Sequence, residues 1–247
     1  MTGSRLERLL RSLWTEQSER DKQRLVGASN LSNECTKCLA EEMALMLVSQ
    51  ADMWDRPESK YVMGAKIGTA VHLWLEEEVK RRDWGVPETR VIVGEIKGYG
   101  VIKSTSDLYV PSEKAIVDHK TTTREKLDVI RTLIRLGRLD DIPEIEMDVH
   151  RAARKKVKRY LVQGNMYGKG AEDRGDVVET VALNFIPRDA KVIDDMYVLE
   201  VEYSRDIAER ALARGQKIWD ALVGGKSWDS FKSDPDCYNC NVVRKGA

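Results

Sequence analysis

Residues 101–120 read VIKSTSDLYVPSEKAIVDHK, and this stretch decides the fold. Its first ten residues are rich in β-branched side chains and predict a strand over 101–110. The sequence Pro111-Ser112-Glu113 predicts a turn, and residues 114–119 predict a short buried strand that returns beside the first. A further β-branched run, residues 89–93, predicts a strand that precedes both. Three strands in close succession predict an antiparallel meander.

Helical periodicity surrounds these strands on both sides. The spacing of apolar residues predicts helices over residues 6–14, 36–52, 67–81, 127–139, 151–170 and 207–223. Two more strands are predicted over residues 177–186 and 192–203. Helices followed by strands, and then helices and strands mixed, predict an α/β fold with a central sheet and helices on its faces.

The bulk composition narrows the class of protein. The chain has 247 residues, which fits one large domain or two small ones, and its 33% charged and 42% apolar residues are typical of a soluble globular protein. Because the formal net charge is zero, any affinity for nucleic acid must come from local patches. Residues 1–23 lack the apolar core of a signal peptide, and the longest apolar run, residues 43–48, is too short to span a bilayer. These features predict a cytoplasmic protein without membrane contact.

Four cysteines stand as two C-x-x-C pairs at opposite ends of the sequence, and the chain has no others. Each pair places two thiolates within reach of one metal, and a shared centre would have a four-sulfur shell of Cys35, Cys38, Cys237 and Cys240. Without an export signal, this pattern favours a metal or redox centre over structural disulfides. One shared centre would join the N- and C-terminal segments. A closed shell leaves no position for a substrate, so we expect a structural role.

Two carboxylates and a lysine fall on the predicted hairpin. In a strand, residues two apart point to the same face, so Asp118 and Lys120 emerge side by side, while Asp107 lies across the hairpin. Two close carboxylates attract Mg²⁺ or Mn²⁺, and a lysine beside them can orient a water or stabilise a pentavalent phosphate. The alternative interpretation is a weak salt bridge at a surface turn, because D-x-K is common by chance.

A histidine lies on the helix predicted over residues 67–81, in the sequence Gly68-Thr69-Ala70-Val71-His72. A neutral imidazole is a good ligand for Mn²⁺ and a tolerable one near Mg²⁺. The alternative is a core histidine beside Trp74, which is the more common role of an isolated helical histidine. The residues alone leave both interpretations open.

The helix predicted over residues 151–170 begins with a dense basic segment. Four of its residues fall at spacings of three and four and so share one face: Lys156, Arg159, Gln163 and Tyr167. Two cations, an amide and a phenol suit a phosphate backbone with a base stacked nearby. The alternative is a solvated charged face, the usual meaning of a charge run. The amide and the phenol favour nucleic-acid binding.

In their order, spacing and structural context, these motifs resemble the RecB-type branch of the PD-(D/E)xK nuclease superfamily. The matching motifs are G-x-x-x-H ending at His72, the lone Asp107, D-x-K ending at Lys120 and Q-x-x-x-Y ending at Tyr167. With the cysteines, the resemblance covers residues 35–240, and it is closest to stand-alone iron–sulfur nucleases related to the CRISPR adaptation exonucleases and to the AddB nuclease domain.

The resemblance implies a restriction-endonuclease-like fold, in which helices flank a mixed central sheet. It also implies a single nuclease domain, with N-terminal helices and the first cysteine pair in residues 1–60. The catalytic core would occupy residues 61–203, and a C-terminal helix and the second cysteine pair would occupy residues 204–247.

The resemblance also implies a role for each motif. The ligands of the Mg²⁺ or Mn²⁺ ion would be His72, Asp107, Asp118 and the backbone carbonyl of His119. Lys120 would position the attacking water, and Gln163 and Tyr167 would hold the DNA strand near the scissile phosphate. Glu95, on the strand before Asp107, is a further acidic candidate.

A [4Fe-4S] cluster on the cysteines is the cofactor that the resemblance implies. The family usually places one cysteine before the nuclease core and three after it, whereas this chain divides them two and two. Because four thiolates are still present, a cluster remains the first expectation. Zinc is the competing expectation, since two C-x-x-C pairs also make a four-cysteine zinc site.

These features together predict a metal-dependent deoxyribonuclease, an exonuclease acting on single-stranded DNA ends by attack of metal-activated water. The main alternative is a non-catalytic module that binds DNA ends and has a structural four-cysteine metal site. Such a module would usually have lost an acidic or lysine position, and none is missing. A zinc protein for protein contacts is the third reading. Besides DNA, a second copy of the chain or a recombination or repair protein is a candidate partner.

Overall fold

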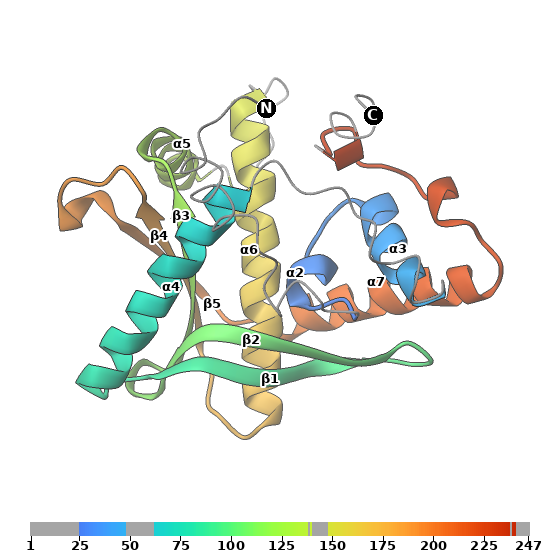
Figure 1. Ribbon diagram of the computed structural model, residues 1–247, viewed down its shortest axis with the longest axis horizontal. Helices are drawn as coiled ribbons and strands as arrows, with labels where there is room; N and C mark the ends of the chain where they lie inside the picture. Colours follow the sequence, from blue (N-terminus) through green and yellow to red (C-terminus); the bar gives the residue numbers. More distant parts are fainter. Residues whose placement is uncertain (1–24, 48–61, 138, 140–147, 238, 241–247) are drawn as a thin grey trace, which may run out of the picture.

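The computed structural model describes residues 25–47, 62–137, 139, 148–237 and 239–240 (Figure 1). The helix predicted over residues 6–14 and the end of the one predicted over 36–52 lie outside the described residues. Within the described part, no helix is both long and apolar enough to cross a membrane.

Five strands form one sheet in sequence order: β1 (Val86–Ile96), β2 (Gly100–Val110), β3 (Ala115–Thr122), β4 (Thr180–Pro187) and β5 (Tyr197–Glu202). The first three strands pair antiparallel, which confirms the predicted meander. β3 and β4 pair in parallel, and β4 and β5 pair antiparallel. The central sheet is therefore mixed, as expected.

The first two strands leave the rest of the sheet as a long ribbon (Figure 1). β2 pairs with β3 only over Leu108 to Val110, whereas its pairing with β1 runs from Gly100 to Tyr109. The far part of the ribbon packs on α7 (Arg205–Val223), and a Cβ added to Gly94 would lie 2.6 Å from Leu212 Cδ1. The sheet therefore forks between β2 and β3.

A long helix, α6 (Asp148–Asp173), crosses the molecule and packs on the sheet (Figure 1). Glycines allow the close approach: a Cβ on Gly164 would collide with Val181 of β4, and one on Gly170 would lie 2.7 Å from Val91 Cβ of β1. Two further helices, α4 (Val62–Arg82) and α5 (Arg124–Arg135), lie on either side of β3 in the sequence. The helices and the sheet together confirm the expected fold class.

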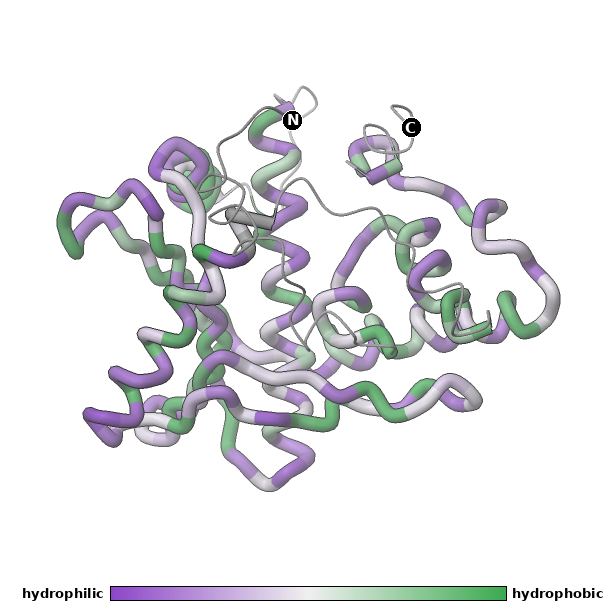
Figure 2. The backbone as a smooth tube through the Cα atoms, viewed as in Figure 1, coloured by the Kyte–Doolittle hydropathy of each residue, from purple (hydrophilic) through white to green (hydrophobic). Residues whose placement is uncertain are grey.

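Two large hydrophobic clusters, and a small third one that joins α4 to β2 through Val79, Leu108 and Val110, hold the described elements together. The larger one joins the ribbon, α6 and α7 to the N-terminal helices α2 (Ala28–Leu31) and α3 (Thr36–Ala44). The second large one joins α5 and α6 to β4 and β5. Figure 2 shows hydrophilic and hydrophobic residues in alternation along α6, and the second part of the helix, Gln163 to Ala171, is buried on all sides.

The strand predicted over residues 192–203 is shorter than expected. A 3₁₀ turn, Ile193–Asp195, replaces its first part, and β5 begins only at Tyr197. The Asp195 carboxylate accepts the backbone N–H groups of Lys191 at 2.7 Å and of Val192 at 3.2 Å. Because an acidic side chain can bond its own backbone in this way, a turn replaces the start of the strand.

The two cysteine pairs meet in space. All four sulfur atoms lie within 4.8 Å of one another, between α3 and the segment that follows α7. The expected link between the N- and C-terminal segments is therefore confirmed.

Candidate active site and cysteine centre

The predicted catalytic residues lie where the sheet forks. β2 and β3 are paired as far as Leu108 and Val117, and the next residues on the two strands are Asp107 and Asp118. The backbone N–H of His119 donates to Asp107 Oδ2 at 2.7 Å. The fork therefore holds both carboxylates at the end of one paired segment.

Gly68 explains how α4 reaches this fork. A Cβ on Gly68 would lie 3.2 Å from Thr121 Oγ1 of β3, so glycine lets the helix approach the strand. His72 follows one turn later, and its Nδ1 lies 3.3 Å from Asp107 Oδ1. The G-x-x-x-H motif thus sets the distance of the helix with its glycine and places its histidine against a carboxylate.

The Asp118–Lys120 pair is buried. Asp118 Oδ2 lies 2.6 Å from Lys120 Nζ, and the two side chains are 2% and 15% exposed. The ammonium group also lies 3.3 Å from Gln163 Oε1 and 4.5 Å from the centre of the Tyr160 ring. This arrangement excludes the alternative interpretation of a weak salt bridge at a surface turn.

The helix α6 brings three polar side chains to the same place. Gln163 donates through its amide nitrogen to the hydroxyl of Tyr167 and faces Lys120 with its oxygen; both α6 side chains are buried. Tyr160 was not among the predicted site residues. It lies four residues after Lys156 and three before Gln163, on the same helical face. Helical spacing could therefore have identified Tyr160 as a residue of the site.

Lys156 and Arg159 have different surroundings. The Lys156 ammonium lies 5.7 Å from the centre of the Tyr160 ring, and its pKa is lowered, first by burial and then by the neighbouring cations Lys126, Lys120, Arg188 and Arg159. Crowded cations of this kind favour a bound anion. The Arg159 guanidinium donates to the Ser29 carbonyl at 2.8 Å, so it also ties α2 to α6.

Among acidic residues of β1, Glu95 lies away from this site and Glu88 lies near it. Glu95 pairs with Val101, six residues from Asp107 along β2, or about 20 Å of strand. Glu88 lines the same groove as Asp107 and has a φ of 46°, which is uncommon for a residue other than glycine. The sequence pattern did not reveal Glu88, because a left-handed residue inside a strand has no period-2 signal.

The electrostatics of the site favour a bound cation. Burial raises the pKa of Asp118 to about 7; Lys120 opposes this rise and Asp107 adds to it. Burial acts in the same direction on Asp107, but the hydrogen bond with His72 and the nearby cations outweigh it and lower its pKa. That hydrogen bond also raises the pKa of His72. A divalent cation would relieve the repulsion, so two carboxylates and an imidazole fit Mg²⁺ or Mn²⁺.

The His119 side chain is directed to the neighbouring strand. Burial lowers the pKa of His119 to about 4, so the imidazole is neutral at pH 7, and its Nδ1 lies 3.1 Å from Asn184 Nδ2 of β4. This contact with Asn184 orients the imidazole towards β4. The predicted metal contact through the His119 carbonyl remains a prediction.

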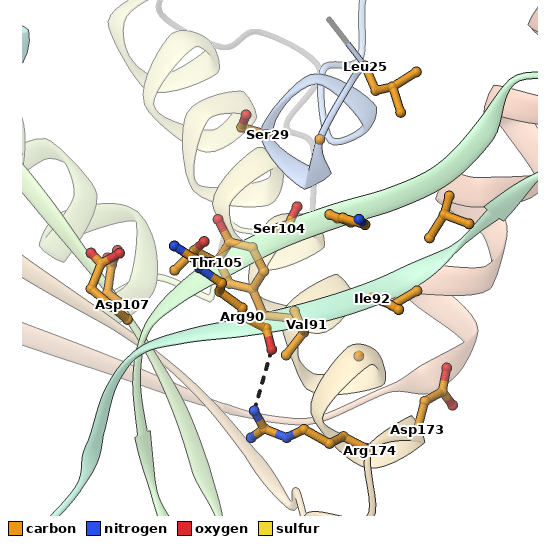
Figure 3. Close-up of a pocket in the computed structure, with 16 residues that line it drawn as sticks. Leu25, Ser29, Arg90, Val91, Ile92, Ser104, Thr105, Asp107, Asp173 and Arg174 are labelled. Atoms are coloured by element: carbon orange, nitrogen blue, oxygen red, sulfur yellow. Dashed lines mark hydrogen bonds between the residues drawn. The ribbon is translucent and has the colours of Figure 1, made fainter. Parts of the chain in front are cut away.

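A groove opens from this site along the ribbon (Figure 3). Its volume is about 1220 Å³, and its lining comes from β1, β2, α6 and the residues around α2. Asp107 lies at one end of the view, and Ile92 and Arg174 lie towards the other. Arg174 donates to the Arg90 carbonyl at 3.4 Å, which joins the end of α6 to β1.

The cysteine sulfurs form a compact cluster. Cys38 Sγ lies 3.4 Å from Cys237 Sγ and 3.6 Å from Cys240 Sγ, and Cys35 Sγ lies 3.7 Å from Cys240 Sγ. Burial raises the pKa of Cys38 and raises that of Cys240 to about 11. Burial also opposes ionisation of Cys35, but hydrogen bonds led by the Asp234 backbone lower its pKa to about 7. Since a metal cation stabilises thiolates, the four sulfurs fit a thiolate-bound metal.

Contacts from two long helices support this centre. The Asp234 backbone N–H donates to Cys35 Sγ at 3.4 Å, and Lys155 of α6 lies 2.7 Å from carboxylate oxygens of both Asp234 and Asp236. Arg214 of α7 donates to three carbonyls in the segment before Cys35, those of Leu31, Asn33 and Glu34. The centre is therefore tied to the helix that carries Gln163 and Tyr167.

Comparisons with known proteins identify the fold. No family model matches the sequence, and no curated protein matches it. A solved structure of an alkaline exonuclease from Laribacter hongkongensis is similar over 96% of this chain and 100% of its own, at 12% identity and a TM-score of 0.51. A putative exonuclease from Eubacterium rectale is similar over 94% and 93%, at 14% identity and a TM-score of 0.49. The likeness to the alkaline exonuclease shows that the chain shares its fold.

Proposed function

We propose that this protein is a metal-dependent nuclease that hydrolyses DNA. The observation that carries the proposal is the cluster at the fork, where the pairs His72–Asp107 and Asp118–Lys120 lie side by side although they come from three separate elements. A buried carboxylate pair with a lysine beside it is a poor choice for stability alone, because desolvation of charges is costly. Perturbed carboxylates next to an open groove are typical of a functional site.

Each residue has a specific part in the proposed reaction. A bound Mg²⁺ or Mn²⁺ would activate water and offset charge on the phosphate. Asp107, Asp118 and His72 supply the donors that would hold the ion. Lys120 is fixed by Asp118, Gln163 and Tyr160, so its ammonium group can orient a water or neutralise negative charge that develops on the phosphate. Gln163 and Tyr167 would position the strand, with Lys156 and Arg159 as cations for its backbone.

The proposed substrate is a single-stranded DNA end. The alkaline exonuclease whose fold this chain shares supports exonuclease action, and the groove beside Asp107 has room for a few nucleotides of one strand. The second candidate function, a module that binds DNA ends without cleaving them, is less favoured because the acidic residues and the lysine are all in place.

End-labelled DNA tests this proposal. We expect metal-dependent shortening of single-stranded DNA with Mg²⁺ or Mn²⁺, no shortening with EDTA, and slower digestion of duplex DNA. The position of the surviving label gives the polarity of digestion. DNA binding without any cleavage, from protein whose cysteine centre is intact, would instead support the binding module.

For the cysteine centre we propose a single tetrahedral ion, zinc. With Zn–S bonds of about 2.3 Å, a tetrahedron has sulfurs about 3.8 Å apart; three of the observed spacings are 3.4, 3.6 and 3.7 Å, and all lie within 4.8 Å. In a [4Fe-4S] cluster each thiolate binds a different iron, and the cluster itself occupies the space between the sulfurs. The cluster that the family resemblance implies is the other candidate.

Metal analysis distinguishes the two candidates. We expect one zinc per chain and a colourless protein, because Zn²⁺ has a filled d shell and no visible absorption. Purification without oxygen is the necessary control, since exposure to air can destroy a cluster. Brown protein with about four irons per chain would contradict the zinc proposal and support the cluster.

A further inference from the structure

Both faces of the β1–β2 ribbon contribute to the groove, and Val91 and Ser104 lie on the face towards α6 and α2. Lys103, Thr105 and Asp107 alternate along β2 and therefore point to the same side of the ribbon. On the paired strand, Arg90 lies opposite Thr105 and Ile92 lies opposite Lys103. Arg90 and Lys103 are therefore diagonal neighbours, about 7–8 Å apart, on the face that leads to Asp107.

Two of the cations on this face form no ion pair with the described residues. Arg90 and Lys103 are exposed, and neither has an ion-pair partner within the described part of the chain. The other charges farther from the fork are already neutralised: Arg174 pairs with Asp176, and Asp173 pairs with Lys169 and Arg205. The groove therefore has two free positive charges beyond the metal site, and a polyanion is the complementary ligand.

The rest of the lining suits a nucleotide strand. The Thr105 hydroxyl can contact a phosphate, while Ile92 is 56% exposed and Val101 is 37% exposed on the same surface. Exposed apolar side chains beside cations allow bases to lie on one part of the surface and phosphates on the other. A volume of about 1220 Å³ has room for a few nucleotides.

We propose that this groove binds the single-stranded segment of DNA next to the scissile phosphate, with Arg90 and Lys103 contacting its phosphates. The inference rests on the proposed nuclease function and adds a path for the substrate. From Asp107 to Val101 the ribbon is about 20 Å long, enough for about six stacked nucleotides at about 3.4 Å each. Occupancy of the groove would make affinity depend on strand length.

Binding to oligothymidylates of increasing length tests the groove directly. The measurement uses Lys120→Ala protein, so that the DNA stays intact, and compares it with the same protein carrying Arg90→Ala and Lys103→Ala. We expect the added substitutions to weaken binding of a long oligonucleotide on the order of tenfold and to reduce the salt slope by about 1.4, or about 0.7 for each lost phosphate contact. The gain in affinity with length, up to about six nucleotides, should largely disappear.

A matched variant removes two cations elsewhere. Arg210 and Lys217 are exposed on α7 and do not line the groove, so Arg210→Ala with Lys217→Ala makes the same change in net charge. We expect this control to retain the length dependence and nearly all of the salt slope. Equal losses in the two double variants, or a loss seen with duplex but not with single strands, would overturn the inference.

Cleavage by protein with an intact Lys120 separates the groove from the nuclease proposal. If the Arg90→Ala and Lys103→Ala variant cleaves long single strands with a raised KM and the original kcat, both proposals stand. If it cleaves long strands with an unchanged KM, the groove inference fails and the nuclease stands. If the unsubstituted protein cleaves no DNA, the nuclease proposal fails, while the length series still reports whether strands occupy the groove.

Discussion

Replacing Lys120 with alanine should abolish DNA cleavage, with a loss in kcat of at least about 10³-fold. The ammonium group is the only cation in contact with Asp118 among the described residues, and it is held from three directions by Asp118, Gln163 and the Tyr160 ring. Alanine removes the group that would orient water or stabilise the phosphate, and leaves the carboxylates that we propose as ligands of the ion. The measurement is single-turnover digestion of end-labelled single-stranded DNA with saturating Mg²⁺.

The same variant should keep its fold and most of its affinity for DNA. Lysine contributes one charge to a site whose backbone is fixed by β2, β3 and β4, so we expect a similar circular dichroism spectrum. Lys191→Ala is the matched control, because Lys191 is exposed on the turn before β5 and far along the sequence from the fork. Cleavage by Lys120→Ala at more than about a tenth of the original rate would show that another group carries this role.

The parts of the fold that depend on local pattern were predictable. Runs of β-branched residues and the Pro111-Ser112-Glu113 turn indicated the meander, and the apolar spacing of residues 151–170 indicated the helix α6. The β3–β4 pair is parallel and closes a loop that contains both α5 and α6. Such long-range pairing leaves no local sequence signal, so the order of strands came only from the structure.

The candidate site, like the fold, was predictable only in part. The motifs indicated His72, Asp107, Asp118 and Lys120, and their assembly at one point depends on the fork between β2 and β3. Tyr160 was missed although its helical spacing was readable, because a tyrosine between basic residues has no motif of its own. Glu95 was overvalued, since strand assignment alone does not reveal that the ribbon extends away from the fork.

Loss of the cysteine centre should destabilise the protein more than any substitution at the fork. Metal binding to four thiolates contributes directly to folding, with apparent free energies of about 10–16 kcal/mol in small zinc domains. Only part of that free energy would be lost in this protein, because the hydrophobic cluster around α6 remains. We expect the free energy of unfolding to fall by about 5 kcal/mol. Cys38→Ser should therefore lower the Tm by roughly 10–20 °C, measured by calorimetry of metal-loaded protein.

The damage should be greatest where the centre joins the two ends of the chain. Cys38 lies in contact with both Cys237 and Cys240, whereas the fork is held by β2, β3 and α6, so limited proteolysis should cut near α3 and the segment after α7 first. Added zinc should raise the Tm of metal-depleted original protein but not that of Cys38→Ser, which separates metal loss from a packing defect. Lys155 links Asp234 and Asp236, which lie beside the cysteines, to α6, which carries Gln163 and Tyr167. We therefore expect Cys38→Ser to cleave DNA more slowly than the original protein, but not to lose cleavage. An unchanged Tm with full metal content would show that three cysteines suffice and that the fourth is not needed for the link.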